Sequence, residues 1–204
     1  MTSAAFWDNI AEKYASDPID DMDAYTVTLD RMKALLQPHH RVLEMGCGTG
    51  STALELAGGV DRYVGTDISK NMIAIAREKA AETDLDHLSF EVASADAPIG
   101  PHQDVVIALN LLHLVPNVDR HIQQIYDALP SGGLFIAKTA LLKDGAWFLG
   151  PAVFAMRAVG KAPYVVRLSE KQFLGQITAA GFEIEETLLQ PGMAPRLFTV
   201  ARKP

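Results

Sequence analysis

The sequence predicts an α/β fold: a mostly parallel, seven-stranded sheet with helices on both faces and an antiparallel last strand. Three observations predict it. Short apolar segments alternate with amphipathic ones between residues 41 and 140. A glycine-rich turn follows the first of these segments. The last two apolar segments are separated only by the turn PGMAP, which is typical of a hairpin and turns the final strand back on its neighbour.

Composition and charge are those of a single globular domain spanning residues 1–204. Hydrophobic residues make up 49% of the chain and charged residues 21%, with a formal net charge of −7. This negative charge, without a basic run, disfavours a nucleic-acid partner. The start MTSAAFWDNIAEKY does not resemble a signal peptide, and no apolar run is long enough for an integral membrane segment. We therefore expect a cytoplasmic protein.

Residues 1–37 are predicted to form a helical cap of two helices, broken near Asp17 and Pro18. Apolar side chains at three- and four-residue intervals mark one face of the second helix. These side chains are Met22, Tyr25, Leu29, Met32 and Leu36.

Residues 38–140 are predicted to form the core of the sheet, and residues 169–204 a helix and the closing hairpin. The predicted strands are residues 41–45, 61–66, 87–92, 104–112, 134–140, 182–190 and 196–202. The predicted helices between them are residues 50–57, 69–82, 118–129 and 169–180. Ser69 is a favourable N-cap, and Gly181 is placed to end the last helix.

The turn after the first predicted strand is the part of the sequence that indicates a ligand-binding site. In VLEMGCGTG, the strand containing Glu44 is followed by Gly46, Gly48 and Gly50. A turn without Cβ atoms lets a ligand lie against backbone N–H groups, as in nucleotide-type cofactor sites at the carboxyl edge of α/β sheets. Cys47, between two of the glycines, would contribute its backbone rather than its thiol, and a lone cysteine forms no internal disulfide.

The glycine spacing distinguishes two cofactor classes. The nicotinamide fingerprint is G-x-G-x-x-G, whereas this turn is G-x-G-x-G and places Ser51 at the third fingerprint position. This disfavours an NAD(P)-dependent oxidoreductase, which is kept as an alternative.

Several further segments resemble the class I S-adenosylmethionine-dependent methyltransferases. The first motif of that family matches VLEMGCGTG, and later motifs match VGTDIS, SADA, LNLLHLV and LPSGGLFIAKT. The opening FWDNIAEKY is similar to the segment that folds over the cofactor, with Tyr14 at the aromatic position. The resemblance covers nearly all residues after Phe6. It implies a Rossmann-like fold, methyltransferase activity and S-adenosylmethionine as cofactor.

The resemblance also implies roles for two acidic residues. Asp67 would accept hydrogen bonds from both ribose hydroxyls, because an ionised carboxylate is only an acceptor. Alternatively, it supplies negative charge to the helix that starts near Ser69. Glu44 would offset the positive charge of the cofactor's amino acid end, or would simply face solvent from the end of its strand.

Other predicted cofactor contacts lie further along the chain. Asp96, beside Ala97, would accept from the adenine amino group or only cap its loop. Ile68 and Met72 would enclose the adenine ring, or belong to the core. Asn110 would meet the cofactor's amino group at the end of the fourth strand.

Methyl transfer depends more on aligning the reactants than on proton transfer. Alignment contributes roughly 7–11 kcal/mol, whereas a general base contributes about 3–5 kcal/mol. His113 is the best candidate base, because a neutral imidazole accepts a proton near pH 7. It could instead be a buried histidine that fixes a loop. Asp119, His121 and Tyr25 are weaker candidates. No metal site is expected, because no histidine has ligand-forming neighbours at suitable spacing.

Residues 141–168 form an apolar insertion. Its apolar side chains include Leu141, Leu142, Trp147, Phe148, Leu149, Val153, Phe154, Met156 and Val159. One hypothesis is a lid over a small hydrophobic or aromatic substrate. A homodimer contact, contact with a membrane surface and ordinary packing are alternatives. A protein that binds S-adenosylmethionine without catalysis is a further alternative for the whole chain.

Overall fold

The fold was determined as a computed structural model that describes residues 2–145 and 162–204. These residues contain a seven-stranded sheet in the order β3-β2-β1-β4-β5-β7-β6. The strands are β1 (Arg41–Met45), β2 (Arg62–Asp67), β3 (Leu88–Val92), β4 (Val105–Leu109), β5 (Leu134–Ala140), β6 (Glu183–Gln190) and β7 (Arg196–Arg202). The first five are parallel, whereas β7 is antiparallel to β5 and β6. The predicted fold class is confirmed.

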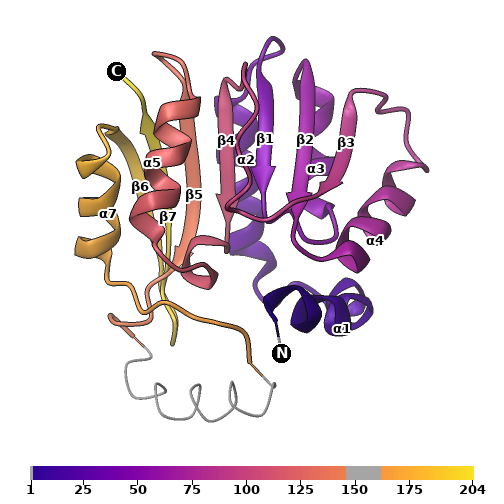
Figure 1. Cartoon of the computed structure of the whole chain (residues 1–204), viewed down its shortest axis with the longest axis horizontal. Coiled ribbons are helices and arrows are strands. Elements are labelled where there is room, and N and C mark those ends of the chain that lie inside the picture. The colour runs from indigo at the N-terminus through magenta and orange to yellow at the C-terminus, as the bar shows by residue number, and fades with distance from the viewer. Residues whose placement is uncertain (1, 146–161) are drawn as a thin grey trace.

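Helices cover both faces of this sheet (Figure 1). One face packs against α2 (Met22–Leu35), α3 (Ser51–Leu56) and α4 (Lys70–Ala80). The other packs against α5 (Val118–Ala128) and α7 (Glu170–Ala179). The first helix, α1 (Ser3–Ser16), lies instead beside the carboxyl ends of the strands (Figure 1). The apolar runs of the central strands follow from this two-sided burial.

Local sequence signals explain where the helices begin and end. The Ser69 hydroxyl accepts a hydrogen bond from the backbone amide of Met72 at 3.1 Å, which caps α4. Ser169 and Gln172 form a reciprocal capping box at the start of α7. Gly181 follows that helix with a φ of 106°, a conformation that favours glycine.

Some predicted boundaries were wrong. The fourth strand ends at Leu109 rather than residue 112, because Asn110 turns the chain with a φ of 55°. The next residues form the short 3-10 helix η2 (Leu112–Leu114). The helix predicted for residues 69–82 ends at Ala80, and α3 is followed by the short helix η1 (Ala57–Gly59). Met22, predicted on the buried face of α2, is 54% exposed.

The sheet has one point where the strand order reverses. From β1, the chain builds outward through β2 and β3 on one side, and through β4 and β5 on the other. Crossovers leave this point in opposite directions, so a crevice for a ligand is expected at the carboxyl ends of β1 and β4. The glycine-rich turn follows β1 at this point.

Candidate cofactor and active site

The glycine-rich turn is fixed to the end of β2. The backbone amides of Gly46 and Cys47 both donate to the carbonyl oxygen of Thr66, at 2.7 and 2.9 Å. Gly46, Gly48 and Gly50 have φ values of 71°, 55° and 76°, which strain any residue with a Cβ. The sequence therefore needs glycine at these positions for the backbone path itself.

The three glycines differ in what surrounds them. A Cβ on Gly50 would lie 2.7 Å from Cζ of Phe90, and one on Gly46 would lie 2.9 Å from Cδ1 of Leu111. A Cβ on Gly48 would meet only Cε1 of Tyr14, at 3.7 Å. Gly46 and Gly50 thus allow close packing within the protein, whereas the backbone of Gly48 faces the tyrosine ring.

Asp67 joins the turn to the start of α4. Its Oδ2 accepts from the backbone amide of Gly48 at 3.1 Å, and its Oδ1 accepts from the amide of Ser69 at 2.8 Å. Burial raises the pKa of Asp67, and the backbone hydrogen bonds oppose this rise. Each carboxylate oxygen keeps a second lone pair. Asp67 therefore stabilises the first turn of α4 and can still accept from a diol.

Glu44 is buried, with only 2% of its surface exposed. The interpretation that it faces solvent is wrong. The Tyr63 hydroxyl donates to its Oε2 at 3.0 Å. Burial raises the pKa of Glu44 to about 7, and the negative charge of Asp67 also raises it. A buried carboxyl with this pKa is stabilised as an anion by any cation that approaches it.

The helix α1 is attached to the first turn of α4 through Asp8. Its Oδ1 accepts from the Ser69 hydroxyl at 2.7 Å and from the backbone amide of Asn71 at 3.2 Å. The Asn71 side chain donates back to the carbonyl oxygen of Asp8 at 3.0 Å. The Ser69 hydrogen bond lowers the pKa of Asp8. This link was not predicted from the sequence, where Asp8 is an unremarkable acidic residue on a helix.

Tyr14 lies near the end of α1, over the glycine-rich turn. Tyr14 is 52% exposed, and its ring lies over Gly48. Partial burial raises the pKa of Tyr14, and the charges of Asp67 and Glu44 raise it further. The tyrosine is therefore close to both acidic residues, as well as to Gly48. The structure therefore brings Tyr14, Glu44, Gly48 and Asp67 together at the carboxyl edge of the sheet.

The loop after β3 contains Asp96 and Ala97. Oδ1 of Asp96 lies 3.8 Å from Nε2 of the buried His121, and the rest of the Asp96 side chain is largely exposed. The carbonyl oxygen of Ala97 accepts from the Gln124 side chain at 2.6 Å. Both contacts come from α5, so this helix holds the loop that was predicted to meet the adenine.

Ile68 and Met72 differ in exposure. Ile68 is exposed directly after β2, so its side chain is available to a ligand. Met72 is fully buried on α4. Their predicted contact with adenine stays a prediction for both.

Asn110 and His113 follow β4. The backbone amide of Asn110 donates to the carbonyl oxygen of Lys138 at 2.7 Å, and the pairing of β4 with β5 ends there. The backbone carbonyl oxygen of His113 accepts from the backbone amide of Val166 at 2.7 Å. This contact does not involve the imidazole, so both interpretations of the side chain stay predictions. Its Nδ1 is buried and finds no hydrogen-bond partner within residues 2–145 and 162–204. Burial and the charge of Arg196 lower the pKa of His113 to about 4.

Sequence reasoning missed two residues near the site, and only Lys138 has a local signal in the sequence. Lys138 interrupts the apolar strand LFIAKTA, and a lysine inside a buried strand is unusual enough to mark a site. Tyr63 lies in the predicted second strand, but nothing local indicates that its hydroxyl reaches Glu44.

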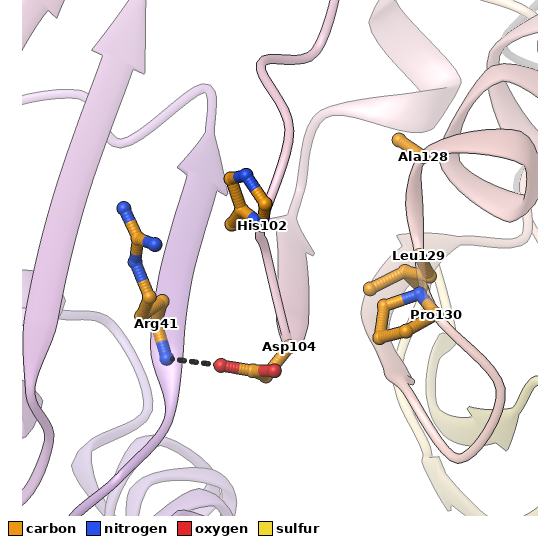
Figure 2. A pocket seen from close by; sticks show the side chains of 6 residues that line it. All are labelled: Arg41, His102, Asp104, Ala128, Leu129 and Pro130. Atoms are coloured by element: carbon orange, nitrogen blue, oxygen red, sulfur yellow. Dashed lines mark hydrogen bonds between the residues drawn. The ribbon is translucent and has the colours of Figure 1, made fainter.

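A separate hollow of about 410 Å³ lies at the opposite, amino edge of the sheet. Figure 2 shows the residues that line it: Arg41, His102, Asp104, Ala128, Leu129 and Pro130. The backbone amide of Arg41 donates to Asp104 there at 2.9 Å. None of the predicted site residues lines this hollow.

Residues 2–145 and 162–204 offer neither a metal site nor a membrane-spanning helix. No group of three or more His, Cys, Asp or Glu side chains there is arranged to hold a metal ion. No helix among the same residues has the length and apolar character needed to cross a bilayer. Residues 146–161, which hold most of the predicted lid, lie outside the described residues.

Comparison with known proteins agrees with this geometry. Residues 42–133 match the methyltransferase domain family. The chain is 30% identical over 185 residues to the 27-O-demethylrifamycin SV methyltransferase of Amycolatopsis mediterranei, covering 87% of this chain and 68% of that protein. It is also 30% identical over 174 residues to polyketide synthase ThaG of Burkholderia thailandensis, covering 67% of this chain but only 3% of that protein.

A solved structure has the same fold. Magnesium protoporphyrin IX methyltransferase from Synechocystis PCC 6803, with bound SAH, superposes with a TM-score of 0.75 at 20% identity. The superposition covers 99% of this chain and 96% of that one.

The sheet order, the glycine turn at the reversal point and the antiparallel last strand define a Rossmann-like cofactor-binding protein. The chain belongs to the class I S-adenosylmethionine-dependent methyltransferases, and S-adenosylmethionine is its cofactor. Family membership overturns the alternative of an NAD(P)-dependent oxidoreductase.

Proposed function

We propose that the protein transfers a methyl group from S-adenosylmethionine to a small hydrophobic or aromatic molecule. The observation that carries this proposal is the environment of Gly48. Its backbone amide donates to the Asp67 carboxylate, and the Tyr14 ring lies over the same glycine. The rifamycin methyltransferase to which the chain is similar acts, by its name, on a small molecule. That similarity supports a small acceptor without identifying it.

The cofactor roles proposed here follow from the contacts in this structure. Asp67 would bind the ribose hydroxyls with the lone pairs that its two backbone hydrogen bonds leave free. Glu44 would stabilise the cationic amino acid end from its buried position. Asp96, whose carboxylate lies 3.8 Å from His121 of α5, would accept from the adenine amino group. Tyr14 would cover the cofactor from α1.

When bound, S-adenosylmethionine supplies an activated methyl group on a sulfonium, which leaves as a neutral thioether. The task left to the protein's own residues is to position the acceptor and exclude water. His113 is neutral at pH 7, because its pKa is about 4. Its imidazole can accept a hydrogen bond from the molecule to be methylated, but a pKa this low makes His113 a weak general base. We therefore propose that His113 orients the acceptor more than it removes a proton.

Binding of S-adenosylmethionine by an Asp67→Ala variant tests the proposed site. We expect the affinity to fall by at least about tenfold, because two hydrogen bonds to a charged group are lost. Isothermal titration measures this directly. Asp61→Ala is the matched control, since Asp61 is exposed just before the other end of β2.

Unchanged affinity in folded Asp67→Ala protein would contradict the assignment of Asp67. Catalysis is tested separately by release of S-adenosylhomocysteine with a panel of small aromatic acceptors. Cofactor binding without transfer to any of them would favour the alternative of a non-catalytic binding domain.

A further inference from the structure

Two cationic residues, Lys138 and Arg196, lie on the same face of the sheet at its carboxyl edge. In the antiparallel pair β5 and β7, Lys138 is opposite Phe198 and Ala140 is opposite Arg196. Residues opposite one another, or two apart on one strand, point to the same face. Phe198 belongs to the core beneath α2, so Lys138 and Arg196 are diagonal neighbours on that face.

Lys138 is only 8% exposed. Its Nζ donates to the Thr28 hydroxyl of α2 at 3.2 Å. The same hydroxyl accepts from the Gln190 side chain at 3.0 Å and donates to the carbonyl oxygen of Ala24 at 2.8 Å. The Thr28 hydroxyl thus makes all three of its hydrogen bonds and carries no charge. The ion pairs found among the described residues do not include Lys138.

The charge of this lysine is therefore not neutralised by a carboxylate in contact. Burial and the positive charge of Arg196 lower the pKa of Lys138 to about 8, while Asp21 opposes this change. The ammonium is still mostly protonated at pH 7. Buried cations are costly unless an anion compensates them, so this position favours an anionic ligand.

Arg196 is the exposed first residue of β7. We find no hydrogen bond or ion pair of its guanidinium with the residues that the structure describes. Its charge nevertheless influences the pKa values of Tyr14, His113 and Lys138. Arg196 is opposite Ala140, the last residue of β5, so it lies at the carboxyl edge of the sheet, where the glycine-rich turn and Asn110 also lie.

We propose that Arg196 and Lys138 bind an anionic oxygen of the acceptor, such as a carboxylate or an ionised phenol or enol, and so select acidic acceptors. This inference rests on the proposed function. A guanidinium offers two parallel donors that match a carboxylate, and the ammonium adds a second cation on the same face. The cofactor itself carries one carboxylate, on its amino acid end. The test therefore uses protein whose cofactor site is already filled, so that only an acid bound beside the cofactor supports the proposal.

The test measures binding of matched acids and amides to protein saturated with S-adenosylhomocysteine. Three pairs serve as probes: benzoate and benzamide, 2-naphthoate and 2-naphthamide, and octanoate and octanamide. Isothermal titration should show at least one acid binding about tenfold more tightly than its amide, since charge-assisted hydrogen bonds exceed neutral ones.

The variants Arg196→Gln and Lys138→Met should reduce this preference to less than about threefold, and Arg196→Lys should keep part of it. Arg62→Gln is the matched control. Arg62 is also an exposed arginine that starts a strand, but it lies at the amino edge of β2. It should leave the preference unchanged. Because Arg196 is exposed, its variants can be expected to fold even if Lys138→Met does not.

Equal affinity for acid and amide, or no binding of any acid to protein that holds S-adenosylhomocysteine, would overturn the inference. So would a preference that survives Arg196→Gln. Failure to bind S-adenosylhomocysteine at all would instead contradict the proposed function, so the two failures are distinguishable.

Discussion

At the scale of single residues, Glu44 and Asp67 show how one turn gives two carboxyl groups different properties. Burial raises the pKa of Asp67, but the carboxylate accepts two backbone hydrogen bonds that favour its ionised form. Glu44 accepts one hydrogen bond from Tyr63 and has a pKa of about 7, which burial raises from the usual 4.5. Its charge therefore depends on pH in the neutral range.

This pKa predicts how cofactor affinity depends on pH. A cationic ligand binds best when Glu44 is ionised, so affinity for S-adenosylmethionine should rise about tenfold between pH 6 and pH 8. In Glu44→Gln protein, this dependence should disappear. Isothermal titration across that range measures both. An equally steep dependence in the variant would show that another group titrates.

The raised pKa of Glu44 makes the stability of the free protein depend on pH in the opposite direction from its affinity for the cofactor. Because the folded-state pKa of Glu44 is raised, its contribution to stability is fully present below pH 4.5 and is lost as the pH rises through about 7. The free protein should thus lose stability over the range in which its affinity for the cofactor increases.

Gly50 predicts a second residue-scale effect. In Gly50→Ala, the new Cβ would combine a φ of 76° with contacts of 2.7 Å to Phe90 and 2.9 Å to Ala76. We expect a loss of about 2–5 kcal/mol in the free energy of unfolding. Gly132→Ala is the control, because Gly132 has a φ of 81° but no neighbour within 4 Å. It should lose about 1–2 kcal/mol. Equal losses in urea unfolding would rule out the packing contribution.

At the scale of elements, the sequence predicted best those helix and strand ends that depend on neighbouring residues in the chain. Ser69 and Ser169 mark the starts of α4 and α7, because a serine hydroxyl can satisfy an amide two or three residues on. The fourth strand was predicted too long, because the apolar residues Leu111 and Leu112 resemble a continuing strand. Pairing with β5 ends at Asn110, and only the neighbouring strand determines that end.

The attachment of α1 to α4 gives a prediction at this scale. Asp8→Ala removes the acceptor of the Ser69 hydroxyl and of the Asn71 amide. We expect cleavage within α1 by limited proteolysis to become about tenfold faster, with weaker cofactor binding. The control is Asp17→Ala, because the Asp17 carboxylate pairs with the exposed Lys13 of α1 rather than with α4. Unchanged proteolysis in Asp8→Ala would show that α1 is held by other contacts.

At the scale of the whole molecule, the site is assembled from distant parts of the chain. Glu44 and Asp67 come from the ends of β1 and β2, Tyr14 from α1, and Arg196 from the start of the last strand. The parallel strands bring their carboxyl ends to one edge, and the antiparallel β7 begins at that same edge. A ligand held by all of them would stabilise the complete fold.

This predicts a thermal shift on binding. S-adenosylhomocysteine at about one hundred times its dissociation constant should add about 2.7 kcal/mol. For a chain of this size, the melting temperature should rise by about 5–10 °C. NADH should give no shift, and Asp67→Ala should lose most of the shift given by S-adenosylhomocysteine. Scanning fluorimetry measures all three. A shift with NADH alone would contradict the assigned cofactor class.

The sequence by itself determined the order of the elements, the glycine turn and the acidic residues at the strand ends, because periodicity, capping and backbone conformation are local properties. It also predicted Asp67 beside the turn, since consecutive parallel strands end at one edge. Only the tertiary structure decided that Glu44 is buried against Tyr63 and that Asp8 holds α1. The same holds for Arg196 beside Lys138. Those pairs depend on strand register and helix docking between segments far apart in the chain, which no local pattern encodes.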